Sequence, residues 1–186
     1  DVLEKNSKNV AQLLENLLTW ARSQSGKITY TPMDLGINAI INNSIDIANI
    51  QAHEKSITLN YNNSISDEVL VQADSNTLIT VFRNILSNAI KFTPDNGNIN
   101  ISAEEDDRFV TVSISDSGVG IPEDKLPTIF DIDRNYSSKG TNQELGTGLG
   151  LILCREFVEK NGGTIWADSQ IGVGSTFSFT IPKAQS

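Results

Sequence analysis

Residues 84–91 read NILSNAIK and lie within an apolar pattern that predicts a helix over residues 74–92. On a helical wheel the side chains of Asn84, Asn88 and Lys91 fall within roughly 60° of each other, beside the apolar stripe. Asparagine is a mediocre helix former, so two of them one turn apart beside a core need an explanation. Either this face is merely solvated, or it offers amide oxygens that suit Mg²⁺ and an ammonium group that suits phosphate.

A second motif, DSGVGIP, occupies residues 116–122 directly after a predicted strand. The carboxylate of Asp116 only accepts hydrogen bonds, so it suits the exocyclic amino group of adenine and not the carbonyl of guanine. A charged hydrogen bond of this kind contributes about 1.5–3 kcal/mol. Gly118 and Gly120 would let the backbone approach a base closely. The alternative is an ordinary strand-to-loop turn, where Asp and Gly are common.

A third motif, GTGLGL, occupies residues 146–151 and opens a predicted helix over residues 149–160. Free N–H groups at a helix start, with the helix dipole behind them, form a ready anion site. The spacing G-x-G-x-G after a long loop is not the dinucleotide fingerprint, and the sequence contains no P-loop. The alternative interpretation is a glycine hinge without a ligand.

The composition bounds the kind of protein. A chain of 186 residues with 38% hydrophobic residues suits one domain plus an appendage. No apolar stretch approaches the ~18 residues that a membrane span needs. The net charge of −9 argues against binding to nucleic acid or to an anionic membrane, and the single cysteine excludes an internal disulfide. No leader is recognised at the start, where a helical pattern is already running, so we expect a piece of a longer protein.

Residues 1 to about 24 carry a seven-residue apolar repeat with Leu3, Val10 and Leu17 on one row, and Leu14 and Ala21 on the other. This pattern is typical of a coiled-coil or bundle seam. We expect paired helices here, with an amphipathic helix docked on its own domain as the alternative.

The remaining pattern mixes strands and helices in an order that predicts an α+β sandwich with helices on one sheet face. A hairpin is expected from residues 98–104 and 109–115, and a helix capped by Asp34 is expected to run to about His53. Pro94 stops the asparagine-bearing helix. Further strands are predicted at residues 28–31, 56–61, 69–73, 164–169 and 175–181.

Together, these motifs and a closing GVGSTF at residues 172–177 resemble the histidine kinase catalytic domain across nearly all of residues 27–182. That family shares the Bergerat ATP-binding fold with DNA gyrase and the mismatch-repair ATPases. The resemblance implies a two-layer α/β sandwich, with a mixed sheet covered on one face by helices and a long helix before it. Residues 1–26 resemble the second helix of the family's dimerisation and phosphoacceptor hairpin. Residues 27–186 would be the catalytic ATP-binding domain, with a lid at about residues 121–147.

The resemblance also implies an ATP–Mg²⁺ site in which Asn84, Asn88 and Lys91 are the catalytic residues. Asn88 and Asn84 would hold Mg²⁺, Lys91 would contact phosphate, and Asp116 would select adenine. In the lid, Tyr136 would stack near the base, and Lys139 or Arg134 would contact phosphate unless they are simply exposed charges. The full set expected at the nucleotide is Asn84, Asn88, Lys91, Asp116, Gly118, Gly120, Ile121, Tyr136, Lys139, Gly146, Thr147, Gly148, Leu149, Gly150, Leu151 and Thr176.

Two features depart from the family pattern. The family often has two phenylalanines three residues apart at the lid entry, and here Phe130 is followed by Asp133, which puts the packing of the lid in doubt. The only histidine, His53, lies outside the motifs and is expected to be an ordinary surface or packing residue. The phosphoacceptor histidine is therefore expected on a helix absent from this fragment.

Several functions compete. A two-component sensor kinase would transfer the ATP γ-phosphate to a histidine of the same protein or its dimer mate, and then to an aspartate of a response regulator. The related ATPases place a glutamate base one turn before the metal-binding asparagine, where this chain has Asn84, which cannot take a proton. A catalytically silent interaction module and a protein-serine kinase also compete with the sensor kinase. The sensor kinase interpretation implies a homodimer and a cytoplasmic location.

Overall fold

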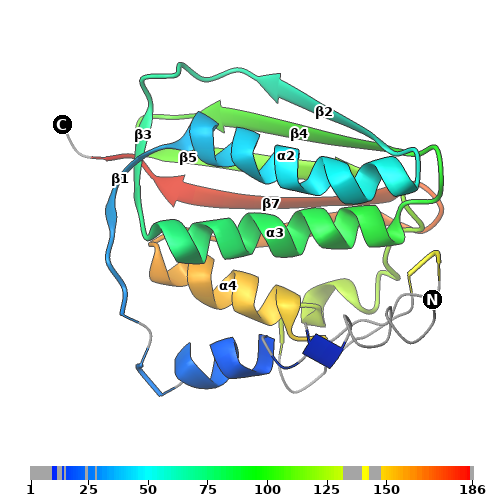
Figure 1. Ribbon diagram of the computed structural model, residues 1–186, viewed down its shortest axis with the longest axis horizontal. Coiled ribbons are helices and arrows are strands. Elements are labelled where there is room, and N and C mark those ends of the chain that lie inside the picture. The colour runs from blue at the N-terminus through cyan, green and yellow to red at the C-terminus, as the bar shows by residue number, and fades with distance from the viewer. Residues whose placement is uncertain are drawn as a thin grey trace.

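The computed structural model of this protein describes residues 10–11, 14, 16–23, 25–27, 29–131, 140–142 and 148–184. The domain contains a short strand, β1, a central sheet, and the helices α2, α3 and α4, which alternate with the strands along the chain (Figure 1). The elements in chain order are β1 (Met33–Gly36), α2 (Ile37–Glu54), β2 (Thr58–Asn63), β3 (Leu70–Ala73), α3 (Ser75–Phe92), β4 (Asn98–Glu105), β5 (Phe109–Asp116), the 3₁₀ turn η1 (Leu126–Thr128), α4 (Gly150–Lys160), β6 (Ile165–Gln170) and β7 (Gly174–Pro182).

The sheet is mixed. Its strand order is β2-β4-β5-β7-β6, with β2 parallel to β4 and every other neighbour antiparallel. A separate antiparallel pair joins β1 to β3. Helices α2, α3 and α4 lie side by side on one face of the sheet (Figure 1). The predicted α+β sandwich, with helices on one face and a hairpin formed by β4 and β5, is therefore confirmed.

The core lies between this sheet and the helices. Along β5, Val110, Val112 and Ile114 are buried while the residues between them are half-exposed, as expected for a strand with one covered face. The ring of Phe82 from α3 meets that of Phe179 from β7 edge to face, with centroids 5.2 Å apart. Burying each such side chain contributes about 1.5–3 kcal/mol, so this layer holds α3 on the sheet.

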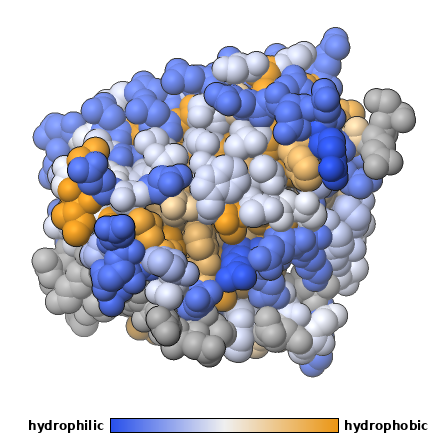
Figure 2. Space-filling model, turned by 180° about the vertical axis from the view of Figure 1, so that it is seen from behind, coloured by the Kyte–Doolittle hydropathy of each residue, from blue (hydrophilic) through white to orange (hydrophobic). Residues whose placement is uncertain are grey.

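The other face of the sheet is polar. Hydroxyl and amide side chains pair across neighbouring strands there, as in the 2.8 Å contact between Ser113 and Ser178 and the 3.0 Å bond between Asn60 and Asn100. Figure 2, seen from this side, shows mostly hydrophilic and neutral colours across the middle of the face.

The bounds of α3 follow from its ends. The carboxylate of Asp74 accepts a 2.9 Å hydrogen bond from the Thr77 N–H and so caps the first turn. Thr93 has extended backbone and precedes Pro94, which disfavours a further helical turn. The helix predicted over residues 74–92 is thus confirmed.

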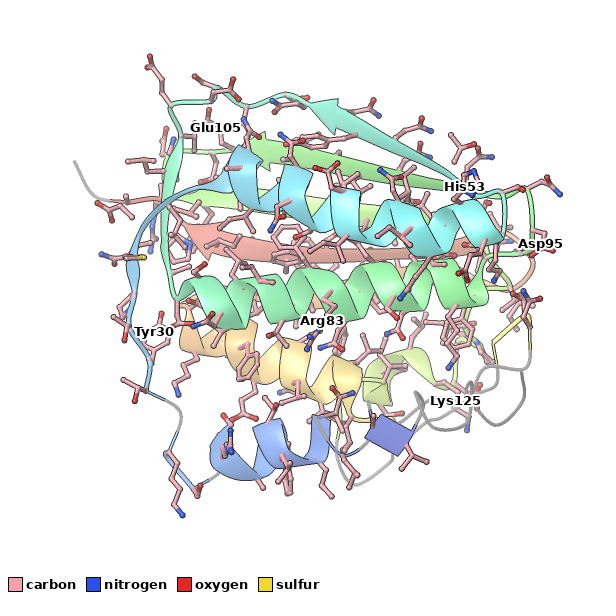
Figure 3. The ribbon with its side chains drawn as sticks, viewed as in Figure 1. Tyr30, His53, Arg83, Asp95, Glu105 and Lys125 are labelled. Carbon is pink, nitrogen blue, oxygen red and sulfur yellow. The ribbon has the colours of Figure 1, made fainter. Side chains whose placement is uncertain are left out.

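A buried asparagine fixes the N-terminal end of α3. The Asn161 side chain accepts hydrogen bonds from the Tyr30 hydroxyl (3.0 Å) and the Asp74 N–H (2.8 Å). Its amide group donates to the Thr77 hydroxyl and to the Phe157 carbonyl. Figure 3 shows Tyr30 beside this end of the helix. The start of α3, the end of α4 and the segment before β1 are therefore tied together.

Two local predictions before α2 were wrong. Residues 29–31 form no strand, and β1 starts only at Met33. Asp34 does not cap α2, because it pairs with Gln72 in the β1–β3 ladder, and Gly36 stands at the N-cap instead. Pairing with a distant strand thus overrode the local capping signal.

The described residues before position 24 are helical. On this helix Asn16 is buried, Trp20 packs against the core, and the Ser23 hydroxyl hydrogen-bonds to Glu156 of α4. The seam residues Val10, Leu14 and Leu17 remain 45–56% exposed, and Leu3 lies outside the described residues. In the described part of this helix, the contacts with the rest of the domain therefore come from residues outside the predicted seam. Among the described helices, none combines the length and apolar character that a membrane crossing requires.

Candidate nucleotide-binding site

Asn84 joins the asparagine motif to the third glycine motif. Its side chain is buried, and its Nδ2 atom has no hydrogen-bond partner among the described residues. Its Oδ1 atom lies against Gly150 of α4, where an added Cβ would come within 3.2 Å of it. A side chain at residue 150 would therefore press on the Asn84 amide, which would have to shift by a few tenths of an ångström. The contact between Asn84 and Gly150 brings together two motifs that are far apart in the sequence.

The buried amide of Asn84 is unusual because an unpaired polar group costs about 1–3 kcal/mol when it is buried. A half-turn of the amide would put an oxygen where the nitrogen now lies, and the two atoms are hard to tell apart in structures. The same position can thus donate to a phosphate oxygen or accept a cation. A buried polar atom without a partner among the described residues, such as Nδ2 of Asn84, is unfavourable in a packed core but is expected in a binding site.

Asn88 and Lys91 continue this row toward the end of α3, and both are partly exposed. Within the described part of the chain, the Asn88 side chain makes no hydrogen bond. The Lys91 ammonium lies 4.5 Å from the centroid of the Phe92 ring. The structure thus keeps Asn84, Asn88 and Lys91 on one helix face, where Asn84 is buried and the other two are partly exposed.

Asp116 forms a second polar centre at the end of β5. Its side chain is buried, and its Oδ1 atom accepts hydrogen bonds from the Gly118 N–H (2.8 Å) and the Ser175 N–H (3.3 Å). Burial raises the pKa of Asp116 to about 6, although the two N–H groups act in the opposite direction. A carboxylate held in this way keeps accepting capacity for a further donor.

The glycines around Asp116 are required by the protein's own packing. A Cβ on Gly118 would lie 2.6 Å from the Phe92 carbonyl oxygen, and one on Gly174 would lie 1.9 Å from the Asp116 carbonyl oxygen. Gly120 has a φ of +73° and would place a Cβ 2.2 Å from the Gln170 carbonyl oxygen. The backbone segments at this end are therefore in direct contact, and a side chain at any of these positions would separate them.

The start of α4 is where the sequence predicts an anion site. Gly148 has a φ of +71°, and Leu149 stands at the N-cap without a side-chain capping bond. The first N–H groups of α4 are thus not satisfied by a capping side chain of the described residues. Leu151 is half-buried and packs against the core. Gly146 and Thr147 lie outside the described residues, as do Asp133, Arg134, Tyr136 and Lys139.

Thr176, which the sequence predicts at the nucleotide, does not lie beside Asp116. Its hydroxyl donates to the Ser115 hydroxyl at 2.9 Å on the polar face of the sheet, away from the helices. Ser175, which pairs with Asp116 across the strands, is buried beside the carboxylate instead. Strand alternation in the sequence could have predicted that Ser175, and not Thr176, faces inward. Phe177 and Phe179 are apolar and face inward, so strand alternation places residue 175 inward and residue 176 outward.

The two polar centres approach each other at the C-terminal end of α3. The Val119 N–H donates to the Phe92 carbonyl at 3.2 Å, and the Thr141 N–H donates to the Lys91 carbonyl at 3.1 Å. Ile121 is held from the other side, because its N–H donates to the Ser169 hydroxyl at 2.8 Å. The end of α3 thus connects the loop after Asp116 with the row that starts at Asn84.

Phe130, the single phenylalanine at the expected lid entry, packs its ring edge to face on Phe177, with centroids 6.4 Å apart. His53 is exposed in the last turn of α2, as expected of a surface residue. Over the described ranges, no group of three or more His, Cys, Asp or Glu side chains could hold a metal.

Comparison with known proteins agrees with this geometry. A family model described as histidine kinase-, DNA gyrase B- and HSP90-like ATPase matches residues 73–185. The adaptive-response sensory kinase SasA of Synechocystis sp. (strain ATCC 27184 / PCC 6803 / Kazusa) is 33% identical over 179 residues, which are 96% of this chain and 46% of SasA. This chain thus spans less than half of that relative.

Solved structures give the same result. The catalytic domain of histidine kinase ThkA, in a nucleotide-free form, has a TM-score of 0.71 and 30% identity, and the match covers 84% of this chain and 97% of that one. Full-length ShkA in complex with AMPPNP has a TM-score of 0.82 and 26% identity over 100% of this chain and 38% of ShkA. This chain therefore belongs to the histidine kinase-, DNA gyrase B- and HSP90-like ATPases, as an ATP-binding catalytic domain of the sensor histidine kinase type.

Proposed function

We propose that this domain binds ATP together with Mg²⁺ between α3, α4 and the end of β5, and passes the γ-phosphate to a protein histidine. The observation that carries the proposal is the buried, unpartnered amide of Asn84 against Gly150, among the residues that the structure describes. The asparagine and glycine motifs meet there, while Asp116 marks the other end of the site.

Asp116 is proposed to select adenine. Its Oδ1 atom is already occupied by the Gly118 and Ser175 N–H groups, so the other oxygen accepts from the exocyclic amino group. Guanine presents an acceptor at that position, and two acceptors facing each other would lose the bond. Ser175 replaces Thr176 in the proposed site, since it lies beside the carboxylate.

Asn88 and Asn84 are proposed to hold Mg²⁺, and Lys91 to contact phosphate. The donor set fits, because amide oxygens are hard neutral ligands and Mg²⁺ also takes water and phosphate oxygens. When bound, the ion offsets charge on the β- and γ-phosphate oxygens. The N–H groups at the start of α4, which has no side-chain cap, add neutral donors for the same anion.

Transfer to a side chain is favoured over hydrolysis. Activating a water requires a group that accepts a proton, and the residue one turn before Asn88 is Asn84, whose amide cannot. A histidine is nucleophilic without such help, so the domain needs only to position and neutralise the phosphoryl group. This argument sets the kinase above an ATPase of the gyrase or mismatch-repair kind.

The acceptor is proposed to be a histidine on the phosphoacceptor helix of the same protein or its dimer mate. His53 is not assigned this role, because it lies on α2, outside the motifs and outside the segment that resembles the phosphoacceptor hairpin. Residues 1–26 are proposed as the second helix of a dimerisation hairpin, whose exposed seam of Val10, Leu14 and Leu17 would pair in a homodimer. A response regulator aspartate would then receive the phosphate, in the cytoplasm, where ATP is available.

A test is to incubate the full-length protein with ATP labelled in the γ-phosphate, and to compare label on the protein with label released as free phosphate. The proposal predicts acid-labile label on a histidine and little release. Asn43→Ala, which changes an exposed asparagine of α2, serves as the matched control for Asn84→Ala and Asn88→Ala. Release without protein label would favour an ATPase, and neither product would favour a silent interaction module.

A further inference from the structure

Lys55, one residue beyond α2, is a buried lysine that the proposed chemistry does not use. Only 7% of it is exposed. Its ammonium donates to the carbonyl of Ile90 at 2.8 Å and to that of Lys91 at 3.4 Å, both in the last turn of α3. It also donates to the Thr141 hydroxyl at 2.6 Å. Hydrogen bonds to these described acceptors help to compensate for burial of the charge.

Thr141 is tied to the same place by its own groups. Its N–H donates to the Lys91 carbonyl at 3.1 Å, and its hydroxyl lies 3.1 Å from that oxygen and 3.2 Å from the Thr93 carbonyl. Lys55 and Thr141 therefore both bind the main-chain carbonyl of Lys91, the residue that is proposed to contact phosphate. The segment around Thr141 is fixed to the end of α3 at this point.

The backbone of Lys55 also links the end of α2 to the end of α3. Its carbonyl accepts a 2.9 Å hydrogen bond from the Asn96 N–H in the turn after α3. Figure 3 shows His53, near the end of α2, and Asp95, in the turn after α3, at one end of the molecule. The ends of α2 and α3 are thus joined through both the main chain and the side chain of Lys55.

The charge of Lys55 matters because of where it lies. The C-terminal carbonyls of a helix carry about half a negative charge, which repels an anion at that end. Asn88 and Lys91, which are proposed to face the phosphates, occupy the last turns of α3. A cation bonded to the terminal carbonyls offsets this repulsion in surroundings of low dielectric constant, where charges act strongly. Burial also shields it from the salt that screens exposed charges.

We propose that Lys55 is a positioning residue for the phosphate end of the site. Its buried ammonium holds the last turn of α3 and Thr141 together, and it neutralises the helix end that faces the triphosphate. The inference rests on the proposed function. It predicts that Lys55 governs affinity for the phosphates and leaves recognition of the adenine end to Asp116.

The test compares two ligands: AMPPNP with Mg²⁺, followed by calorimetry, and adenosine, followed by NMR titration. Lys55→Met keeps the aliphatic length and removes the charge. We expect it to weaken AMPPNP binding about tenfold and adenosine binding less than about twofold. Lys27→Met, at an exposed lysine with the same change in net charge, controls for long-range electrostatics and is expected to behave as wild type.

Thr141→Val keeps the side-chain shape and removes the hydroxyl. It is expected to weaken AMPPNP binding about two- to fivefold without affecting adenosine. The proposal is overturned if folded Lys55→Met binds AMPPNP like wild type, or if it loses both ligands equally, which would indicate only structural support. If Lys55→Met does not fold, Thr141→Val decides: a loss confined to AMPPNP supports the proposal, and wild-type binding overturns it. Failure of wild type to bind AMPPNP would instead contradict the proposed function.

Discussion

The proposed adenine end of the site is built from backbone, whereas the proposed phosphate end is built from side chains on one helix. At the adenine end, the N–H groups of Gly118 and Ser175 hold the Asp116 carboxylate, and glycines allow the strands and loops to touch. At the phosphate end, Asn84, Asn88 and Lys91 share a face of α3, and the Asn84 amide lacks a partner among the described residues. One end is therefore sensitive to backbone geometry and the other to the chemistry of single side chains.

The two ends share one property, which is that each carries a polar group that destabilises the ligand-free domain. Burial raises the pKa of Asp116 to about 6, so its ionised form, which dominates at neutral pH, costs more free energy in the folded state than in the unfolded state. The buried amide of Asn84 is unsatisfied within the described part of the chain. Such costs are typical of binding sites, where removing a functional group stabilises the fold and abolishes binding.

The largest expected effect comes from filling backbone space at the adenine end. Gly174→Ala should lower the free energy of unfolding by more than about 3 kcal/mol, because its Cβ would lie 1.9 Å from the Asp116 carbonyl and its φ is +138°. Gly36→Ala is the matched control, since nothing lies within 4 Å of its added Cβ, and it should cost about 1 kcal/mol or less. Urea denaturation measures both. Equal stability of the two variants would show that the strands can separate freely here.

Asp116→Asn should weaken AMPPNP binding by about 10- to 100-fold, because an amide nitrogen would replace the acceptor facing adenine. The same change should raise the free energy of unfolding at pH 8, by up to about 3 kcal/mol for a shift from 3.8 to about 6. The pKa is raised on folding, so this carboxyl stabilises the fold most below pH 4 and loses that contribution as the pH rises through 6. Thermal melts at pH 4 and pH 8 check the sign, and a stability loss in the variant at pH 8 would contradict it.

Binding should therefore depend on pH through Asp116. Below its pKa of about 6, AMPPNP affinity of the wild type should fall about tenfold per pH unit, because the carboxyl must lose a proton to accept from adenine. The Asp116→Asn variant reports the contribution of the phosphates alone. Calorimetry from pH 8 to pH 5 on both proteins measures the difference, and parallel curves would show that Asp116 does not titrate in this range.

The smallest effect concerns stability at the phosphate end. Asn84→Leu keeps a branched side chain and removes the unpaired amide, so the unfolding free energy should be unchanged or rise by about 1 kcal/mol. Nucleotide binding should be lost in the same variant. Thermal melts compare it with Asn43→Leu, an exposed position in α2. A clear loss of stability at residue 84 alone would mean that the amide is satisfied in solution.

Much of this architecture could be predicted because its signals are local. Asp74 and Pro94 bound α3, and alternating apolar residues define β5. Predictions failed where distant contacts decide the outcome, as at Asp34, whose partner is Gln72. Ser175 was missed although alternation with Phe177 placed it inward.

Lys55 shows a limit of a different kind. Nothing around it in the sequence distinguishes it from an exposed lysine at a helix end. Its burial depends on acceptors 35, 36 and 86 residues away, at Ile90, Lys91 and Thr141. A charged side chain is buried only when such partners converge on it, and their convergence is a property of the folded chain.

The most direct test of the site is a calorimetric titration of wild type and Asn88→Ala with AMPPNP and Mg²⁺, repeated without the metal. The account predicts a wild-type dissociation constant between about 1 μM and 1 mM that weakens without Mg²⁺, and a variant that binds at least about tenfold more weakly. Asn43→Ala should bind like wild type. A folded Asn88→Ala that binds as tightly as wild type, with the same response to Mg²⁺, would contradict the central claim.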